Sequence, residues 1–164
     1  MTTQFPDNPH FQELADEHRQ WFKAFDPQYV ANWEKLLDGD HEAALYEAAV
    51  RRNLQSLGVV VEPNESLTGD NRRPDFRCAF GAYRFYVEVS CIPVSKAEEK
   101  TGVSANRPGF YPWSPFRLIE SILSKCRNKY KQFQNLDGPA LLAVGTFEGY
   151  AAMSLKEKVV IAAS

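Results

Sequence analysis

Two strand-like segments joined by a two-residue turn constrain the fold of this chain more than any other feature. Residues 74–80 form the first segment, Gly81–Ala82 the turn, and residues 83–91 (YRFYVEVSC) the second. In the second segment, apolar residues at odd positions alternate with a more polar set, the period-two pattern of a strand. That polar set is Arg84, Tyr86, Glu88 and Ser90. The chain is therefore predicted to contain a β-hairpin with two chemically different faces.

Helical patterns surround this hairpin on both sides. Helices are predicted at 9–24, directly after Pro27, at 41–57 and at 115–133, and further strands at 59–61 and 140–144. Asp40 is expected to cap the helix at 41–57, and Gly58 to end it in the left-handed conformation. Residues 92–115 contain four prolines and are predicted to form a long loop. This order predicts an α/β fold, a mixed central sheet flanked by helices.

Composition limits the chain to one main globular domain. It has 164 residues, of which 44% are hydrophobic and 24% charged, so a disordered chain is not expected. No apolar run approaches the roughly 20 residues of a membrane span, and the first ten residues do not read as an export signal. Three cysteines match no zinc spacing, which favours reduced thiols in a cytoplasmic protein. We divide the chain into an N-terminal helical extension (1–40) and an α/β core (41–164).

Charge is distributed unevenly along the chain. The first 47 residues carry ten acidic residues against three basic ones, whereas the remainder carries sixteen basic residues against eleven acidic ones. A basic C-terminal part is compatible with a nucleic-acid-binding face that attracts phosphates. The alternative, a solvated surface with a modest excess of lysine and arginine, stays open. His10, His18 and His41 show no ligand spacing and are expected at the surface or at helix caps.

Two acidic residues stand out within the predicted hairpin. Asp75 enters the first strand after Pro74, which suits a first strand position because proline donates no ladder hydrogen bond. Glu88 interrupts an aromatic and β-branched strand (FYVEV), where an acid needs a partner. A tight hairpin would bring both carboxylates to one edge of the sheet. Adjacent carboxylates are costly unless a cation neutralises them, and Mg²⁺ takes oxygen ligands.

The run Pro74–Asp75, a hairpin and Val87–Glu88–Val89–Ser90, between a glutamate-bearing helix and a basic helix, resembles the PD-(D/E)XK nuclease superfamily. That superfamily includes restriction endonucleases and archaeal Holliday junction resolvases. The resemblance covers about residues 42–145 and implies a restriction-endonuclease-like arrangement of the core. It implies Asp75 and Glu88 as metal-binding acids. It also implies that Glu47 is the first-helix glutamate that joins or supports the metal.

Ser90 departs from the family pattern, which has a lysine at that position. Some members move this lysine to the following helix, where this chain offers Lys125, Lys129 and Gln132. Lys125 and Lys129 are four residues apart and share a helix face, and Lys129 and Gln132 are neighbours three apart. Lys129 is the first choice for the migrated lysine and Lys125 the second.

The resemblance implies phosphodiester hydrolysis with Mg²⁺ (or Mn²⁺). Asp75, Glu88 and the Val89 carbonyl would hold the ion, and the migrated lysine would stabilise developing negative charge. DNA is the expected substrate, with RNA as the alternative, and a homodimer would allow both strands to be cut. Basic residues expected to contact phosphates are Arg72, Arg73, Arg117, Arg127 and Lys131.

The sequence leaves a second function open. The chain could be a catalytically inactive module of the same fold that binds nucleic acid or a protein partner, and Ser90 favours this alternative. The retained pair Asp75 and Glu88 favours the nuclease. Geometry discriminates between the two: carboxylates that converge with a lysine from the basic helix support catalysis, whereas Glu88 buried against an arginine does not.

Overall fold

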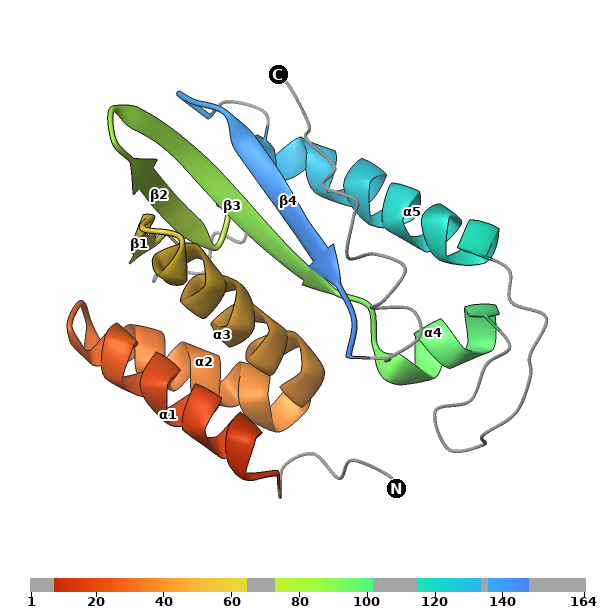
Figure 1. The fold of residues 1–164 in the computed structure, drawn as a ribbon, viewed down its shortest axis with the longest axis horizontal. Coiled ribbons are helices and arrows are strands. Elements are labelled where there is room, and N and C mark those ends of the chain that lie inside the picture. Colours follow the sequence, from red (N-terminus) through yellow and green to blue (C-terminus); the bar gives the residue numbers. More distant parts are fainter. Residues whose placement is uncertain (1–7, 65–72, 102–114, 134–135, 148–164) are drawn as a thin grey trace.

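The computed structural model describes residues 8–64, 73–101, 115–133 and 136–147 and places a mixed four-stranded sheet among helices (Figure 1). The elements in chain order are α1 (Pro9–Lys23), α2 (Pro27–Gly39), α3 (His41–Ser56), β1 (Val60–Pro63), β2 (Phe76–Phe80), β3 (Tyr83–Cys91), α4 (Val94–Thr101), α5 (Pro115–Phe133) and β4 (Ala140–Gly145). The predicted α/β class is confirmed. Within these ranges, none of the helices combines the length and apolar character that crossing a membrane requires.

The sheet has the strand order β1-β2-β3-β4. β1, β2 and β3 pair antiparallel, with Phe76 opposite Val87 in the hairpin. β4 pairs parallel with β3, and Glu88 lies beside Leu142. A parallel pair needs a crossover connection between its strands, and the segment that carries α4 and α5 provides it.

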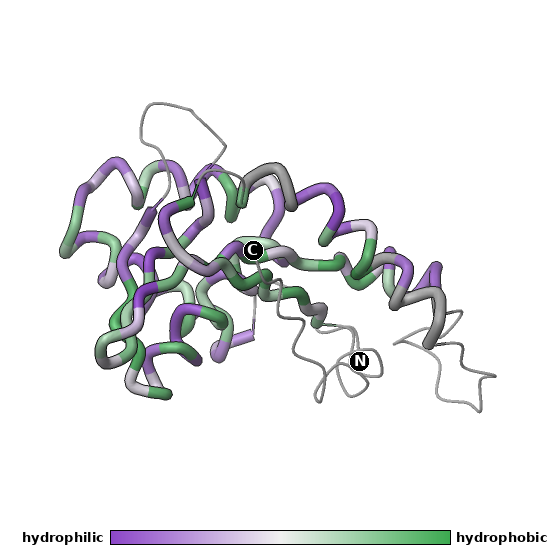
Figure 2. The backbone as a smooth tube through the Cα atoms, turned by 90° about the horizontal axis from the view of Figure 1, so that it is seen from above, coloured by the Kyte–Doolittle hydropathy of each residue, from purple (hydrophilic) through white to green (hydrophobic). Residues whose placement is uncertain are grey.

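The sheet lies between two helical layers, as Figure 1 shows. On one side, Phe76 and Val87 of the hairpin pack with Val50 of α3. On the other side, Ile122 of α5 packs with Val144 of β4. In Figure 2, hydrophobic stretches gather along the middle of the tube, while the outer helices alternate between hydrophilic and hydrophobic residues. Each helix therefore buries one side, as amphipathic spacing predicts.

The ends of α3 confirm the predicted capping residues. The Asp40 side chain accepts a hydrogen bond from the Ala43 amide at 3.0 Å, which satisfies one free N–H of the first turn. Gly58 adopts φ +81°, the left-handed conformation expected after the helix. Gly81, in the hairpin turn, adopts φ +58°. These local signals set where α3 begins and ends before the sheet, and where the chain turns between β2 and β3.

The predicted long loop at 92–115 was wrong at its beginning, because residues Val94–Thr101 form α4. The helix starts directly after Pro93, whose carbonyl accepts from the Lys96 and Ala97 amides at 3.0 and 2.9 Å. Ala97 is fully buried against Ile92 and Ile122. The four prolines suggested a loop, but the stretch that follows the first of them consists largely of good helix formers.

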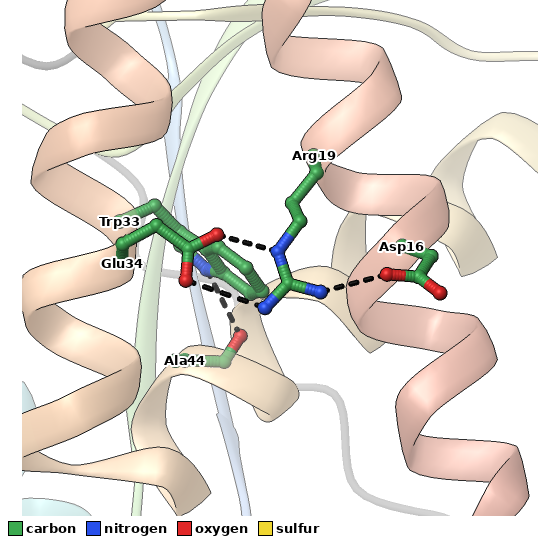
Figure 3. Close-up of polar contacts among 5 residues, drawn as sticks. All are labelled: Asp16, Arg19, Trp33, Glu34 and Ala44. Carbon is green, nitrogen blue, oxygen red and sulfur yellow. Dashed lines mark hydrogen bonds and ion pairs between the residues drawn. The ribbon is translucent and has the colours of Figure 1, made fainter.

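The N-terminal helices share a core with α3. Leu14, Phe22 and Trp33 are buried in one cluster with Ala44 and Ala48. Trp33 Nε1 donates to the carbonyl oxygen of Ala44 at 3.3 Å (Figure 3). The same view shows one guanidinium of α1 joining two carboxylates: Arg19 donates to Glu34 of α2 at 2.5 and 3.2 Å and to Asp16 at 2.7 Å. The first three helices therefore pack as one layer.

Candidate metal centre

The β2–β3 hairpin brings Asp75 next to the part of β3 that carries Glu88. The paired register ends at Phe76, opposite Val87, and Asp75 lies in a bend directly before β2. The prediction that the first strand includes Pro74 and Asp75 was therefore wrong by two residues. Asp75 Oδ2 accepts a hydrogen bond from the Val89 amide at 2.6 Å, which holds this carboxylate against the peptide that follows Glu88.

Glu88 is buried, with only 2% of its surface exposed. Its Oε1 forms an ion pair with Nζ of Lys129, which extends from α5. Its Oε2 is buried and has no hydrogen-bond partner among the described residues. A buried carboxylate oxygen without a donor is costly in a folded protein. This oxygen is therefore the first candidate for a cation ligand.

Burial raises the pKa of Glu88 above its ordinary value, and Lys129 and the backbone amide of Asp75 oppose that rise. The desolvation cost of the ionised carboxylate exceeds the stabilisation that Lys129 provides. A cation beside the free oxygen would shift the balance toward the ionised carboxylate.

The two candidate lysines of α5 reach different atoms of β3. Lys129 contacts the Glu88 carboxylate, while Lys125 Nζ donates to the Cys91 carbonyl at 3.2 Å. Lys129 therefore lies at the acidic pair, and Lys125 binds the end of the strand. Ser90 lies on the same face as Glu88 and is buried, with 6% of its surface exposed.

Glu47 lies on α3 and is also buried, with 5% of its surface exposed. Burial and the negative charge of Glu88 raise its pKa to about 8. The two glutamates are therefore within electrostatic reach of each other. His18 Nε2 lies 3.3 Å from Glu47 Oε1. Glu47 thus connects the acidic pair of the hairpin to the first helix.

His18 corrects the expectation that the histidines lie at the surface or at caps. It is fully buried, and its ring contacts Trp21, Phe22 and Trp33. Burial and the positive charge of Arg51 lower its pKa to about 3, so the ring is neutral. A neutral imidazole packs as an aromatic ring, and His18 lies four residues from both Leu14 and Phe22, on the buried side of α1. That helical spacing was the signal for its burial.

The residues that could bind a metal are few. In the described part of the chain, no group of three or more His, Cys, Asp or Glu side chains lies together in a way that could hold an ion. A centre here would use Asp75, Glu88 and a backbone carbonyl, completed by water or substrate oxygens. Mg²⁺ suits this donor set, because it keeps several waters and needs only one or two carboxylates.

The proposed phosphate contacts are described only in part. Arg73 and Arg127 are exposed to solvent. Arg72 lies outside the described residues, as do the side chains of Arg117, Lys131 and Gln132. Of the residues expected to contact phosphates, Arg73 and Arg127 are therefore the two whose side chains the structure describes.

In three comparisons with known proteins, no family model, curated protein or solved structure matches this chain. Function is therefore inferred from the side chains of the site and not from similarity.

Proposed function

We propose that this chain is a metal-dependent nuclease of the PD-(D/E)XK type, with DNA as its substrate and RNA as the alternative. The observation that carries the proposal is the ion pair between buried Glu88 and Lys129 beside Asp75. Burying a carboxylate and pairing it with a lysine from another element costs desolvation free energy. An acid pair with a convergent lysine is also the combination that metal-assisted hydrolysis uses.

Asp75, Glu88 and the Val89 carbonyl would hold Mg²⁺ (or Mn²⁺), with Glu47 supporting them from α3. The unpartnered Oε2 of Glu88 supports this assignment, because a cation is the partner that a buried carboxylate oxygen lacks. When bound, the ion supplies charge neutralisation at the phosphate and acidifies a water molecule.

The chain's own residues would orient and stabilise the reacting groups. The Val89 amide fixes the Asp75 carboxylate at 2.6 Å and so prevents its rotation away from Glu88. Lys129 holds a positive charge at Glu88, in the position to stabilise negative charge on a phosphate oxygen. Lys125 anchors the Cys91 carbonyl and keeps α5 in register with β3. Lys129 thereby takes the place of the lysine that Ser90 replaces.

A mixed sheet between helical layers is compatible with a restriction-endonuclease-like core, and this arrangement is part of the proposal. The exposed Arg73 and Arg127 would bind backbone phosphates, which position a nucleic acid without reading its sequence. Two copies of the chain would provide two such sites for a double-stranded substrate.

A second function is an inactive module of the same type that binds nucleic acid or a protein. Two observations favour it: Ser90 is buried at the lysine position, and Lys129 forms an ion pair with Glu88. In that case the ion pair would be structural, and the chain would bind nucleic acid without cutting it.

A cleavage assay on single- and double-stranded DNA and RNA tests the proposal. With Mg²⁺ or Mn²⁺, cleavage is expected, and Asp75→Ala, Glu88→Gln and Lys129→Ala should each reduce it at least 100-fold, about the contribution of a positioned charged group. Glu13→Gln and Lys35→Ala alter an exposed acid and an exposed base and should leave it unchanged. Cutting that survives Asp75→Ala and Glu88→Gln would refute the site, and binding without cutting would support the inactive module.

A further inference from the structure

A chain of polar contacts joins Glu47, which lies within electrostatic reach of Glu88, to His18 of the first helix. Glu47 Oε1 lies 3.3 Å from His18 Nε2, and His18 Nδ1 accepts from Arg51 Nε at 3.3 Å. All three side chains are buried, with exposures of 5%, 0% and 5%. His18 comes from α1, whereas Glu47 and Arg51 lie one turn apart on α3.

The contacts of Arg51 fix which nitrogen of His18 carries the proton. A guanidinium only donates hydrogen bonds, so Nδ1 must accept, and a neutral ring then carries its hydrogen on Nε2. Nε2 therefore donates to Glu47 Oε1. This order resembles the way in which outer contacts orient a metal ligand, here with a histidine behind a carboxylate.

Packing alone does not explain a histidine at this place. Its ring lies among Trp21, Phe22 and Trp33, where a phenylalanine would fill the same aromatic pocket. Arg51 additionally buries Nη2, which lies 3.8 Å from Glu17 Oε2 and has no hydrogen-bond partner among the described residues. Arg51 Nη1 also donates to Gln55 Oε1 at 2.7 Å, so the guanidinium is held on α3 while its Nε donates to His18.

We propose that His18 is a positioning residue that orients the Glu47 carboxylate toward the metal held by Asp75 and Glu88. The inference rests on the proposed metal centre and deepens it. The first helix then contributes to metal affinity and is more than a packing element. Arg51 acts indirectly, because its hydrogen bond to Nδ1 keeps the proton of His18 on Nε2.

Mn²⁺ binding, measured by electron paramagnetic resonance on the full chain, tests this role without relying on cleavage. His18→Phe keeps the aromatic packing and removes the donor, and we expect it to weaken Mn²⁺ affinity about 10- to 100-fold. His18→Gln retains an N–H near Glu47 and should remain within about threefold of the wild type, well short of that loss. His41→Gln, at an exposed histidine, is the matched control and should bind as the wild type does.

Wild-type affinity in His18→Phe would overturn the proposal, and so would a loss in His18→Gln equal to that in His18→Phe. Circular dichroism establishes whether His18→Phe is folded. If it is not, Arg51→Met decides, because it leaves His18 in place and removes the donor to Nδ1. Weakened Mn²⁺ binding in Arg51→Met would support the role, and unchanged binding would overturn it.

Asp75→Asn separates this inference from the proposed function. If the wild type does not bind Mn²⁺, or if Asp75→Asn binds it equally well, the metal centre itself fails and the role of His18 fails with it. If Asp75→Asn loses binding while His18→Phe does not, only the role of His18 is refuted.

Discussion

Glu47 and Glu88 are the residues whose chemistry departs most from that of ordinary surface acids. Both are buried, and burial is the largest cause of the raised pKa of each. In Glu47 the charge of Glu88 adds to this effect, whereas in Glu88 the ion pair with Lys129 works against it. Protonation of Glu47 therefore depends on pH near neutrality, while most carboxylates remain ionised there.

The raised pKa of Glu47 predicts that stability falls as pH rises from 6.5 to 8. Between the ordinary pKa of 4.5 and about 8, the folded state binds more protons at Glu47 than the unfolded state, so deprotonation costs stability. His18 acts in the opposite direction, but only between about 3 and 6.5. Urea unfolding at pH 6.5 and pH 8 should show this decline in the wild type and a smaller one in Glu47→Gln.

Glu13→Gln provides the control for this measurement, because Glu13 is an exposed acid on α1. Its decline between the two pH values should equal that of the wild type. An equal decline in Glu47→Gln would contradict the assigned pKa.

The ion pair of Glu88 and Lys129 predicts strong coupling between the two side chains. Lys129→Met leaves a buried carboxylate without its cation and should destabilise the protein by about 3 kcal/mol. Glu88→Gln combined with Lys129→Met should cost less than the sum of the single changes, because the double variant leaves no unpaired charge whereas each single change does. Chemical unfolding of the four proteins measures this coupling, and additive effects would show that the pair contributes nothing to the fold.

At the scale of elements, local chemistry predicted most helices and strands. The bounds of β3 and α5 agree with the predicted residues, since alternation and helical spacing are strong there. β1 begins at Val60, one residue later than expected. α4 was missed because proline-rich surroundings hid a short helix that depends on burial of Ala97 between Ile92 and Ile122.

The site was predictable where it depends on neighbouring strands or on one helix face. The hairpin turn brought Asp75 next to β3, where it accepts from the Val89 amide although it precedes β2, and the spacing of α5 offered Lys129, which contacts Glu88. His18 could not be assigned to Glu47, because 29 residues separate them and only tertiary packing joins α1 to α3. Contacts of that kind carry no periodic signal in the sequence.

The junction of α3 with β4 predicts a strict requirement for glycine at residue 145. A Cβ atom there would lie 2.2 Å from Tyr46 Oη and 2.4 Å from its Cζ. The Tyr46 ring also contacts the Phe147 ring in an edge-to-face arrangement. Gly145→Ala should therefore destabilise the protein by about 1–3 kcal/mol in thermal or urea unfolding.

The matched control is Gly39→Ala at the end of α2, where an added Cβ meets no atom within 4 Å. Alanine there should be neutral or stabilising by about 0.5 kcal/mol, because it restricts the unfolded chain. A Gly145→Ala protein as stable as Gly39→Ala would mean that Tyr46 moves aside without cost.

At the scale of the whole molecule, α1 and α2 decide whether the first 40 residues are an appended helical extension or part of the core. Trp33 and Phe22 fill one buried cluster with Ala44 and Ala48 of α3. Trp21 also contacts Phe76 of β2, with ring centroids 5.8 Å apart. Removal of these helices would expose the apolar side of α3 to water. It would also remove the contact between Trp21 and Phe76 of the hairpin.

Deletion of residues 1–39 is therefore expected to abolish cooperative unfolding, although the Asp40 cap of α3 is retained. The free energy lost includes the burial of several large side chains, each worth about 1.5–3 kcal/mol, which together exceed the stability of a typical domain. Loss of a sigmoidal urea transition, together with binding of a hydrophobic dye, would show the loss of packing. Lys35→Ala in the full chain, an exposed change on α2, should unfold as the wild type does. A truncated protein with the wild-type midpoint would instead establish residues 1–40 as a separable extension.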